Sequence, residues 1–247
     1  MIRALIPRAA TVAATLSLAT SIVQAQTVAE VDEIVARNIA AKGGAATLKS
    51  TTSVRTTGRG TMQGAEMSVV SANKRPFFMR NEMEMAGQKV IQGFDGEKVW
   101  MAMGDEPPRT LPPGPQTETT KRTSQIDSPL LDYKTNGTKI DLGEPLTEAG
   151  RKLHHLVVTP KTGPAMHFYL DAATGLEAKM IIDVEENGQK TRMELQFSDY
   201  KTVEGRTVPF TVKQFVNGNQ VGQMKYEKVE FNVPLDDAIF RMPKIGR

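Results

Sequence analysis

The methionines of this chain are the residues whose spacing could form a binding site. Met83-Glu84-Met85 and Met101-Ala102-Met103 each hold two thioethers two residues apart, so on a β-strand both sulfurs of a pair lie on one face. Thioether ligands favour Cu(I). Methionine is also flexible and polarizable, and it lines apolar surfaces that adapt to irregular guests. The two pairs therefore allow two interpretations, a copper site or an adaptable apolar face.

Other residue types give no comparable signal. His154 and His155 are adjacent and would point to opposite faces of a strand, His167 stands apart, and the chain has no cysteine. The sequence contains neither G-x-S-x-G nor H-E-x-x-H, and no phosphate-binding glycine loop. Acidic pairs such as Glu185-Glu186 fit solvated turns. We expect no enzyme activity, no metal site and no cofactor; a carboxylate pair assembled by folding is the catalytic alternative that the sequence leaves open.

The methionine pairs belong to a stretch, residues 74–103, that predicts three consecutive strands. Its first segment, 77–85, alternates apolar and charged residues, as a half-buried strand does. Asp95-Gly96 is a strong hairpin signal, and Val99, Met101 and Met103 repeat the alternation after it. Burial within a continuous apolar face therefore explains the pairs without a metal.

The rest of the chain predicts one helix followed by an antiparallel meander. Thr27 and Glu30 form a capping box before an apolar stripe over 28–41, and Gly43-Gly44 would end that helix. The segment 125–134 predicts either a short helix that begins at Ser128 or Pro129 and presents Leu130, Leu131 and Tyr133, or a surface turn. The proline-rich stretch 104–118 should not continue a sheet. It is either a lid beside the mid-chain segment or a surface loop without function. Period-two alternation and turn residues predict strands at 54–62, 66–72, 77–85, 89–94, 98–103, 139–142, 153–159, 165–171, 176–185, 190–200, 207–216 and 220–233.

The first residues predict export from the cytoplasm. Arg3 and Arg8 precede an apolar stretch, and Val23-Gln24-Ala25 fits a signal-peptide cleavage site. Residues 1–25 are then a secretory signal peptide, and residues 26–247 are a single periplasmic domain. Without cysteine the mature chain has no site for a lipid anchor.

The charge distribution of the chain predicts no acidic binding partner. Removing 1–25 lowers the net charge of +3 by the two arginines, and the remaining charges alternate in sign along the strands. One tryptophan and four tyrosines offer little base stacking, so we expect no nucleic-acid partner. We expect a monomer.

Several short motifs together resemble the LolA-like lipoprotein carriers of the periplasm. They are Lys74-Arg75-Pro76, the Asp95-Gly96 turn followed by Trp100, SPLLDY after a proline-rich loop, and the closing VPLDDAIFRMP at 233–243. The resemblance extends over residues 27–243. It implies a mainly β fold, a strongly curved antiparallel half-barrel of about ten to twelve strands with the N-terminal and mid-chain helices plugging its concave side.

The resemblance also implies a function. Such proteins carry acyl chains of lipoproteins or other lipids from an inner-membrane transporter to an outer-membrane acceptor, without a cofactor. No arginine among Arg55, Arg59, Arg75 and Arg80 is matched to the family's cavity arginine. The alternatives are a lipid- or lipoprotein-sensing regulator of the same fold and a methionine-rich copper-binding protein. The candidate lipid-binding face consists of Phe77, Met79, Met83, Met85, Val99, Met101, Met103, Leu130, Leu131, Met180 and Phe197.

Copper titration separates the two interpretations of the methionine pairs. We expect the reduced protein to bind Cu(I) with micromolar or weaker affinity in the presence of a competing chelator, because burial accounts for the thioethers. Tight, stoichiometric binding that Met83→Leu abolishes would instead establish a metal site.

Overall fold

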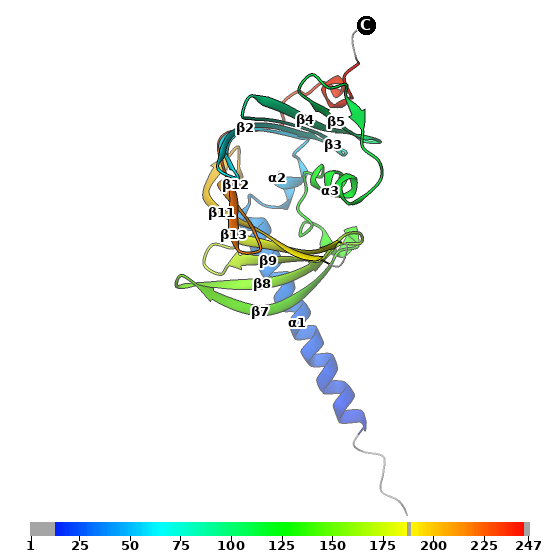
Figure 1. Cartoon of the computed structure of the whole chain (residues 1–247). Helices are drawn as coiled ribbons and strands as arrows, with labels where there is room; N and C mark the ends of the chain where they lie inside the picture. Colours follow the sequence, from blue (N-terminus) through cyan, green and yellow to red (C-terminus); the bar gives the residue numbers. More distant parts are fainter. Residues whose placement is uncertain (1–12, 187–188, 245–247) are drawn as a thin grey trace, which may run out of the picture.

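One curved antiparallel sheet forms the body of the protein. The computed structural model describes residues 13–186 and 189–244. All thirteen strands of these residues join one sheet in the order β6-β5-β4-β3-β2-β1-β13-β12-β11-β10-β9-β8-β7, which bends into an unclosed half-barrel (Figure 1). The strands are β1 (Ser53–Met62), β2 (Ala65–Lys74), β3 (Phe78–Met85), β4 (Gln88–Asp95), β5 (Val99–Met103), β6 (Arg109–Thr110), β7 (Lys139–Glu148), β8 (Arg151–Thr159), β9 (Met166–Asp171), β10 (Glu177–Glu186), β11 (Gln189–Val203), β12 (Arg206–Val216) and β13 (Asn219–Phe231).

The expected half-barrel is confirmed, with one strand more than the upper expected number. Each of the twelve expected strands has a counterpart. The addition is β6, whose Thr110 lies opposite Trp100 of β5. The expectation that 104–118 would not continue the sheet was therefore wrong for two residues. β6 is an edge strand, and proline is tolerated beside an edge because only one side of the strand needs hydrogen bonds.

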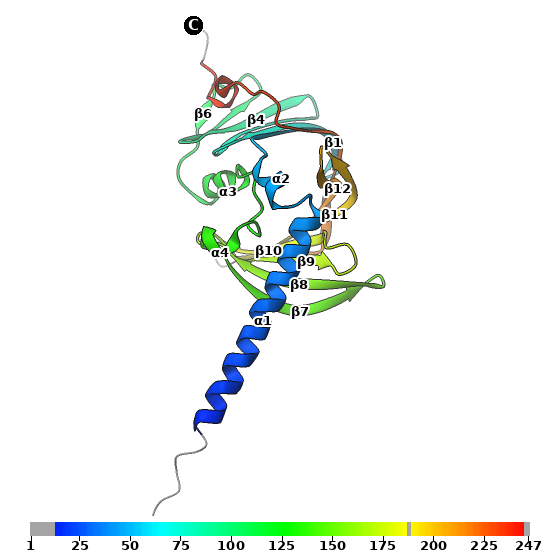
Figure 2. The ribbon, with the colours of Figure 1, turned by 180° about the vertical axis from the view of Figure 1, so that it is seen from behind.

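The N-terminal helix is longer than the sequence predicted. The helix α1 spans Ala13–Ala41, so it does not begin at the capping box of Thr27 but runs without a break through the predicted cleavage point after Ala25. No glycine or proline interrupts 13–41, and alanine-rich segments favour helix. Its first half extends away from the sheet, and its second half crosses β7–β10 (Figure 2). Residues 1–12 of the predicted leader lie outside the described residues.

The mid-chain helices differ in position from the expected one. Residues 129–132 form turns, so the turn and not the helix is correct for this segment. The helices are α3 (Pro115–Thr123) before them and α4 (Tyr133–Asn136) after them, and the short α2 (Ala45–Lys49) was not predicted. Proline suits the first turn of a helix, where its missing N–H needs no partner. The prolines before α3 therefore mark a helix start as well as a loop.

Most of the core lies between α1 and the strands β7–β10. Val31, Ile34 and Val35 of α1 pack with Leu156 and Phe168 in one cluster of buried apolar residues. A separate cluster lies near β3–β5, and a third lies near β12–β13. No helix of the described residues is both long enough and apolar enough to span a membrane.

Polar contacts fix the end of α1 on the sheet. Lys42 binds Glu177 at 2.8 Å, and Asn38 Nδ2 donates to the Gly175 carbonyl at 2.8 Å. Burial alone would raise the pKa of Glu177, but the charge and hydrogen bond of Lys42 outweigh it and hold that pKa below its ordinary 4.5. A carboxyl with a lowered pKa stabilises the fold above its unfolded pKa and loses that contribution as pH falls through the folded value.

We expect Glu177→Gln to lower the free energy of unfolding by about 3 kcal/mol at neutral pH, because Lys42 is left largely buried without a counter-ion. Urea unfolding measures the change. Asp183→Asn, which breaks the exposed pair with Arg192, should cost less than about 1 kcal/mol. Equal losses in the two variants would contradict the assignment, as would a Glu177→Gln protein that loses stability below pH 4.5 as steeply as the parent.

Candidate functional site

The inner face of the sheet carries nearly all of the methionine. Residues directly opposite in neighbouring antiparallel strands share a face, and the register aligns Met67 with Met85 and Met180 with Phe168. Phe168 packs with α1, and Met79 packs beside α3, so both belong to the helix-covered side (Figure 1). By the same register, the inner face includes Met62, Met67, Met79, Met83, Met85, Met101, Met103, Met166, Met180, Met193 and Met224.

The predicted residues of β3 and β5 divide into buried and open ones. Met79 and Val99 are buried with Phe94 and Leu111, and Met101 packs against this cluster. Farther along the strands, Met83 and Met85 are half-buried, and Met103 is 37% exposed. The inner face therefore changes from covered to open along the length of β3.

The other predicted residues do not join this patch. Phe77 lies in the turn before β3 and is 48% exposed. Leu130 and Leu131 are buried in the cluster of α1, and Met180 packs against the same cluster. Phe197 is half-buried on β11, opposite Val212. The sequence thus identified residues of one face but grouped residues from two separate clusters.

The helix α3 covers the buried part of β3–β5 with polar side chains. Its buried residues are Thr117 and Thr120. Gln92 of β4 donates to Thr120 Oγ1 at 3.0 Å, and Asn73 of β2 donates to the Ser124 carbonyl at 3.2 Å. Because hydroxyl and amide contacts exchange readily with water, α3 can leave the sheet at a smaller cost in apolar burial than α1.

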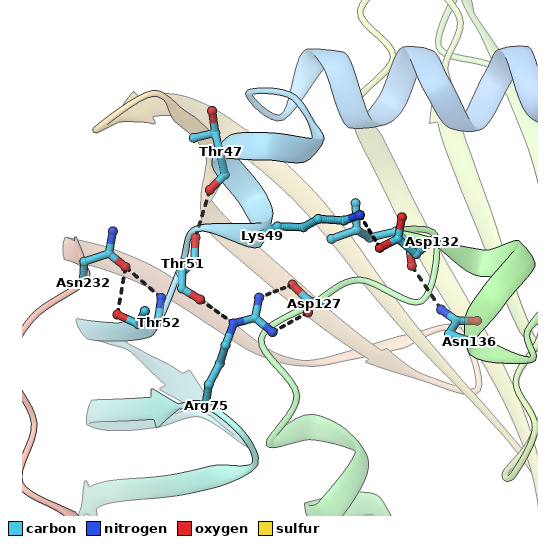
Figure 3. A network of polar contacts seen from close by, with 10 residues as sticks. Thr47, Lys49, Thr51, Thr52, Arg75, Asp127, Asp132, Asn136 and Asn232 are labelled. Atoms are coloured by element: carbon cyan, nitrogen blue, oxygen red, sulfur yellow. Dashed lines mark hydrogen bonds and ion pairs between the residues drawn. The ribbon is translucent and has the colours of Figure 1, made fainter.

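A polar network holds the segment after α3 (Figure 3). Arg75 makes two parallel hydrogen bonds to Asp127, both at 2.7 Å, and its Nε donates to the Thr51 carbonyl at 2.6 Å. This bidentate pairing raises the pKa of Arg75. Lys49 of α2 binds Asp132 at 2.6 Å. Two ion pairs therefore attach residues 127–132 to α2 and to the turn between β2 and β3.

The helix α4 attaches the same segment to α1. Tyr133 Oη donates to Asp32 Oδ1 at 2.6 Å, and Lys134 binds Asp32 Oδ2 at 2.6 Å. The hydrogen bond from Lys134, followed by that from Tyr133, lowers the pKa of Asp32. Burial and the neighbouring carboxylate raise the pKa of Tyr133 to about 12. At neutral pH the tyrosine is therefore a donor to an ionised carboxylate.

Sequence reasoning missed one histidine contact. His155 Nε2 lies 2.9 Å from His167 Nδ1, and His155 also stacks on Tyr169. Burial, and then the neighbouring His167, lower the pKa of His155. The contact lies on the outer face, across the β8–β9 hairpin, and only the register of that hairpin could have predicted it. In 13–186 and 189–244, no three His, Cys, Asp or Glu side chains gather in a way that could hold a metal ion.

Two hollows lie away from the inner face. One, of about 710 Å³, lies between the outer face of β1–β3 and residues 235–244. The other, of about 570 Å³, lies at the sheet end near Thr52 and Asn232. Neither of these two hollows lies on the inner face, where the resemblance implies a space for a guest.

Comparison with solved structures identifies the fold. An outer membrane lipoprotein-sorting protein domain from Vibrio parahaemolyticus aligns with a TM-score of 0.55 at 12% identity, covering 84% of this chain and 94% of that one. A LolA superfamily protein from Nitrosomonas europaea aligns with a TM-score of 0.51 at 12% identity over 77% and 90%. The chain therefore has the LolA-like fold.

A third structure widens the set of proteins with this fold. A DUF1329 family protein from Desulfovibrio piger aligns with a TM-score of 0.57 at 11% identity, covering 85% of this chain and 97% of that one. No family model and no curated protein is matched by the sequence. At these identities the shared property is the fold.

We expect Asp127→Asn to speed amide hydrogen exchange in residues 111–136 by about fivefold while leaving the central strands unchanged, because the loss of one partly exposed ion pair is worth about 1 kcal/mol. Hydrogen exchange with mass spectrometry measures the effect. Glu118→Gln, which removes only the exposed pair with Lys121, should leave the exchange of this segment at the parent rate. Unchanged exchange in Asp127→Asn would show that Arg75 does not hold the segment.

Proposed function

We propose that the protein is a periplasmic lipid carrier that holds acyl chains against the inner face of its sheet. The observation that carries the proposal is the run of half-buried methionines, Met83, Met85 and Met101, on a face that α1 and α3 cover only in part. A flexible thioether surface accepts chains of different shape. The function proposed is non-covalent and requires no cofactor.

The segment of α3 is proposed as the movable cover. Its inward contacts are mostly hydrogen bonds of threonine, glutamine and asparagine, whereas α1 contributes several buried aliphatic side chains. Displacement of α3 would expose Met79, which is now 1% exposed, together with Phe94 and Val99. These residues would extend the open methionine surface into one longer apolar strip.

The energy of acyl binding favours a cover of this kind. A sixteen-carbon chain gains on the order of 12 kcal/mol from burial, at about 0.8 kcal/mol for each methylene, before the cost of ordering. A closed, tightly packed slot would hold such a chain too long for delivery. A polar cover exchanges its hydrogen bonds for bonds to water when it opens, so binding and release can use the same movement.

The same proposal includes location and partners. The predicted leader of residues 1–25 would direct the chain to the periplasm, where an inner-membrane transporter would load it and an outer-membrane acceptor would unload it. The names of two compared structures, a lipoprotein-sorting domain and a LolA superfamily protein, support a lipoprotein as the cargo. A transfer assay between donor and acceptor membranes distinguishes carriage from sensing, because a sensor binds lipid without passing it on.

We expect Met83→Glu to abolish uptake of a fluorescent fatty acid while the β-sheet circular dichroism stays unchanged, because the new carboxylate would be desolvated against the acyl chain. Fluorescence titration measures uptake. Met83→Leu keeps the face apolar and should retain uptake.

The matched control adds the same charge to the other face. Gln223 lies on the outer face of β13, opposite Lys213, and Gln223→Glu should leave uptake at the parent level. Full uptake by Met83→Glu would show that this face does not bind the probe.

A further inference from the structure

The hollow on the outer face of the sheet has a lining of two kinds. Its floor and wall are apolar, and they include Val70, Ala72 and Ile239. Its charged residues are mainly cations, contributed by β1, β3 and the C-terminal segment: Arg55, Arg80, Arg241 and Lys244, with Glu82 as the acidic residue of the lining. An apolar floor beside several cations is the complement of a small anionic amphiphile.

Arg80, one of the four cations of the lining, already has partners. Arg80 donates from Nε to Glu82 and from Nη1 to the Ile239 carbonyl, and Lys89 also binds Glu82. The acidic charge of the lining is thus shared by two cations. On the neighbouring strand, Glu230 lies opposite Arg55 but pairs with Lys228 at 2.6 Å.

The other three cations of the lining make no contact of this kind within the described part of the chain. Among residues 13–186 and 189–244, Arg55, Arg241 and Lys244 make no ion pair and no side-chain hydrogen bond. They come from opposite walls, since Arg55 lies on the sheet and the other two lie on the covering segment. An unpaired cation on each wall favours an anion between them, because charge-assisted hydrogen bonds to phosphate or carboxylate oxygens are short and strong.

The covering segment also contributes exposed apolar side chains to the lining. Ile239 and Met242 are 37% and 40% exposed, among the most exposed large apolar residues of the described chain, and both line the hollow. The hollow of about 710 Å³ is within the size range of small-molecule sites. It has room for a head group and a short alkyl chain.

We propose that this hollow is a second binding site, which takes a phosphate- or carboxylate-headed amphiphile with its anion between Arg55 and Arg241 and its alkyl part against Val70 and Ile239. The site lies on the opposite side of the sheet from the methionine face, so it does not depend on the lipid-carrier proposal. The head group could belong to a membrane lipid or to a free amphiphile, and the chemistry of recognition is the same.

The single tryptophan provides a readout for this site. Trp100 shares the outer face with Arg80, and its Nε1 donates to the Phe240 carbonyl at 2.7 Å. The Arg80 guanidinium lies 5.7 Å from the centroid of the Trp100 ring. A ligand that moves the covering segment will therefore change the tryptophan fluorescence.

The test is a titration of Trp100 fluorescence with hexyl phosphate, with inorganic phosphate and hexanol as head-only and tail-only probes. We expect a saturable change with hexyl phosphate and much weaker responses to the other two. Arg55→Gln and Arg241→Gln should each weaken hexyl phosphate binding about tenfold, the usual effect of losing one charged hydrogen bond. Arg59→Gln is the matched control, since Arg59 lies on the same face of β1 but pairs with Glu227 outside the hollow, and it should bind as the parent does.

Two further experiments locate the binding site and identify the source of the head group. Met83→Glu should leave the hexyl phosphate titration unchanged, because that residue lies on the inner face; loss of the signal in this variant would overturn the outer site. Flotation with anionic and zwitterionic vesicles identifies a membrane lipid as the source if binding to anionic vesicles needs Arg241, and a free amphiphile if it does not. Absence of a saturable hexyl phosphate response, or equal affinity of Arg55→Gln, Arg241→Gln and Arg59→Gln, would overturn the proposal.

Discussion

The need to cover one apolar face of a long sheet determines most of this structure. Alternation along the strands directs the methionines and the other large apolar residues of the inner face to a single side, and water must be kept from that side. The sheet bends instead of closing, so helices supply the cover (Figure 1). The cover is apolar over β7–β10 and polar over β3–β5. The proposed function depends on this difference.

The two covers differ in chemistry. The second half of α1 packs aliphatic side chains against β7–β10 and is tied down by the buried Lys42–Glu177 pair. The helix α3 contacts β3–β5 through threonines and is held by hydrogen bonds and by the Arg75–Asp127 pair. Apolar burial stabilises through released water, whereas polar contacts compete with water. One cover is thus part of the apolar core, whereas the other contacts the sheet mainly through polar groups.

The strands could be predicted from the sequence because alternation is a local signal. The run from Met79 to Met85 identifies both a strand and its apolar face, and the structure agrees. The helices were harder to place. The prolines before α3 predicted the end of the sheet but not the start of a helix. For Leu130 and Leu131 the sequence left a helix and a turn open, and both residues lie in turns. Their burial depends on α1, a contact across a hundred residues that no local pattern encodes.

The candidate site, too, could be predicted from the sequence only in part. Sequence spacing brought Met83, Met85 and Met101 to one face correctly, but it could not separate them from Met180, which packs near α1 on the far side of the curve. The pair of Arg75 and Asp127 is also invisible in the sequence, because its partners lie 52 residues apart and meet only after the sheet has curved. Register gives the face of a residue, and tertiary packing decides its neighbours.

The contacts between α1 and the β9–β10 turn can form only late in synthesis of the chain. Lys42 emerges from the ribosome early, whereas Glu177 follows 135 residues later, and β1 must wait still longer for its neighbour β13. A nascent chain that holds only the first half can form the β1–β5 hairpins, but its amphipathic helix has nothing to dock on. Such delayed pairing slows folding and leaves apolar surface exposed to water until the later strands have been made.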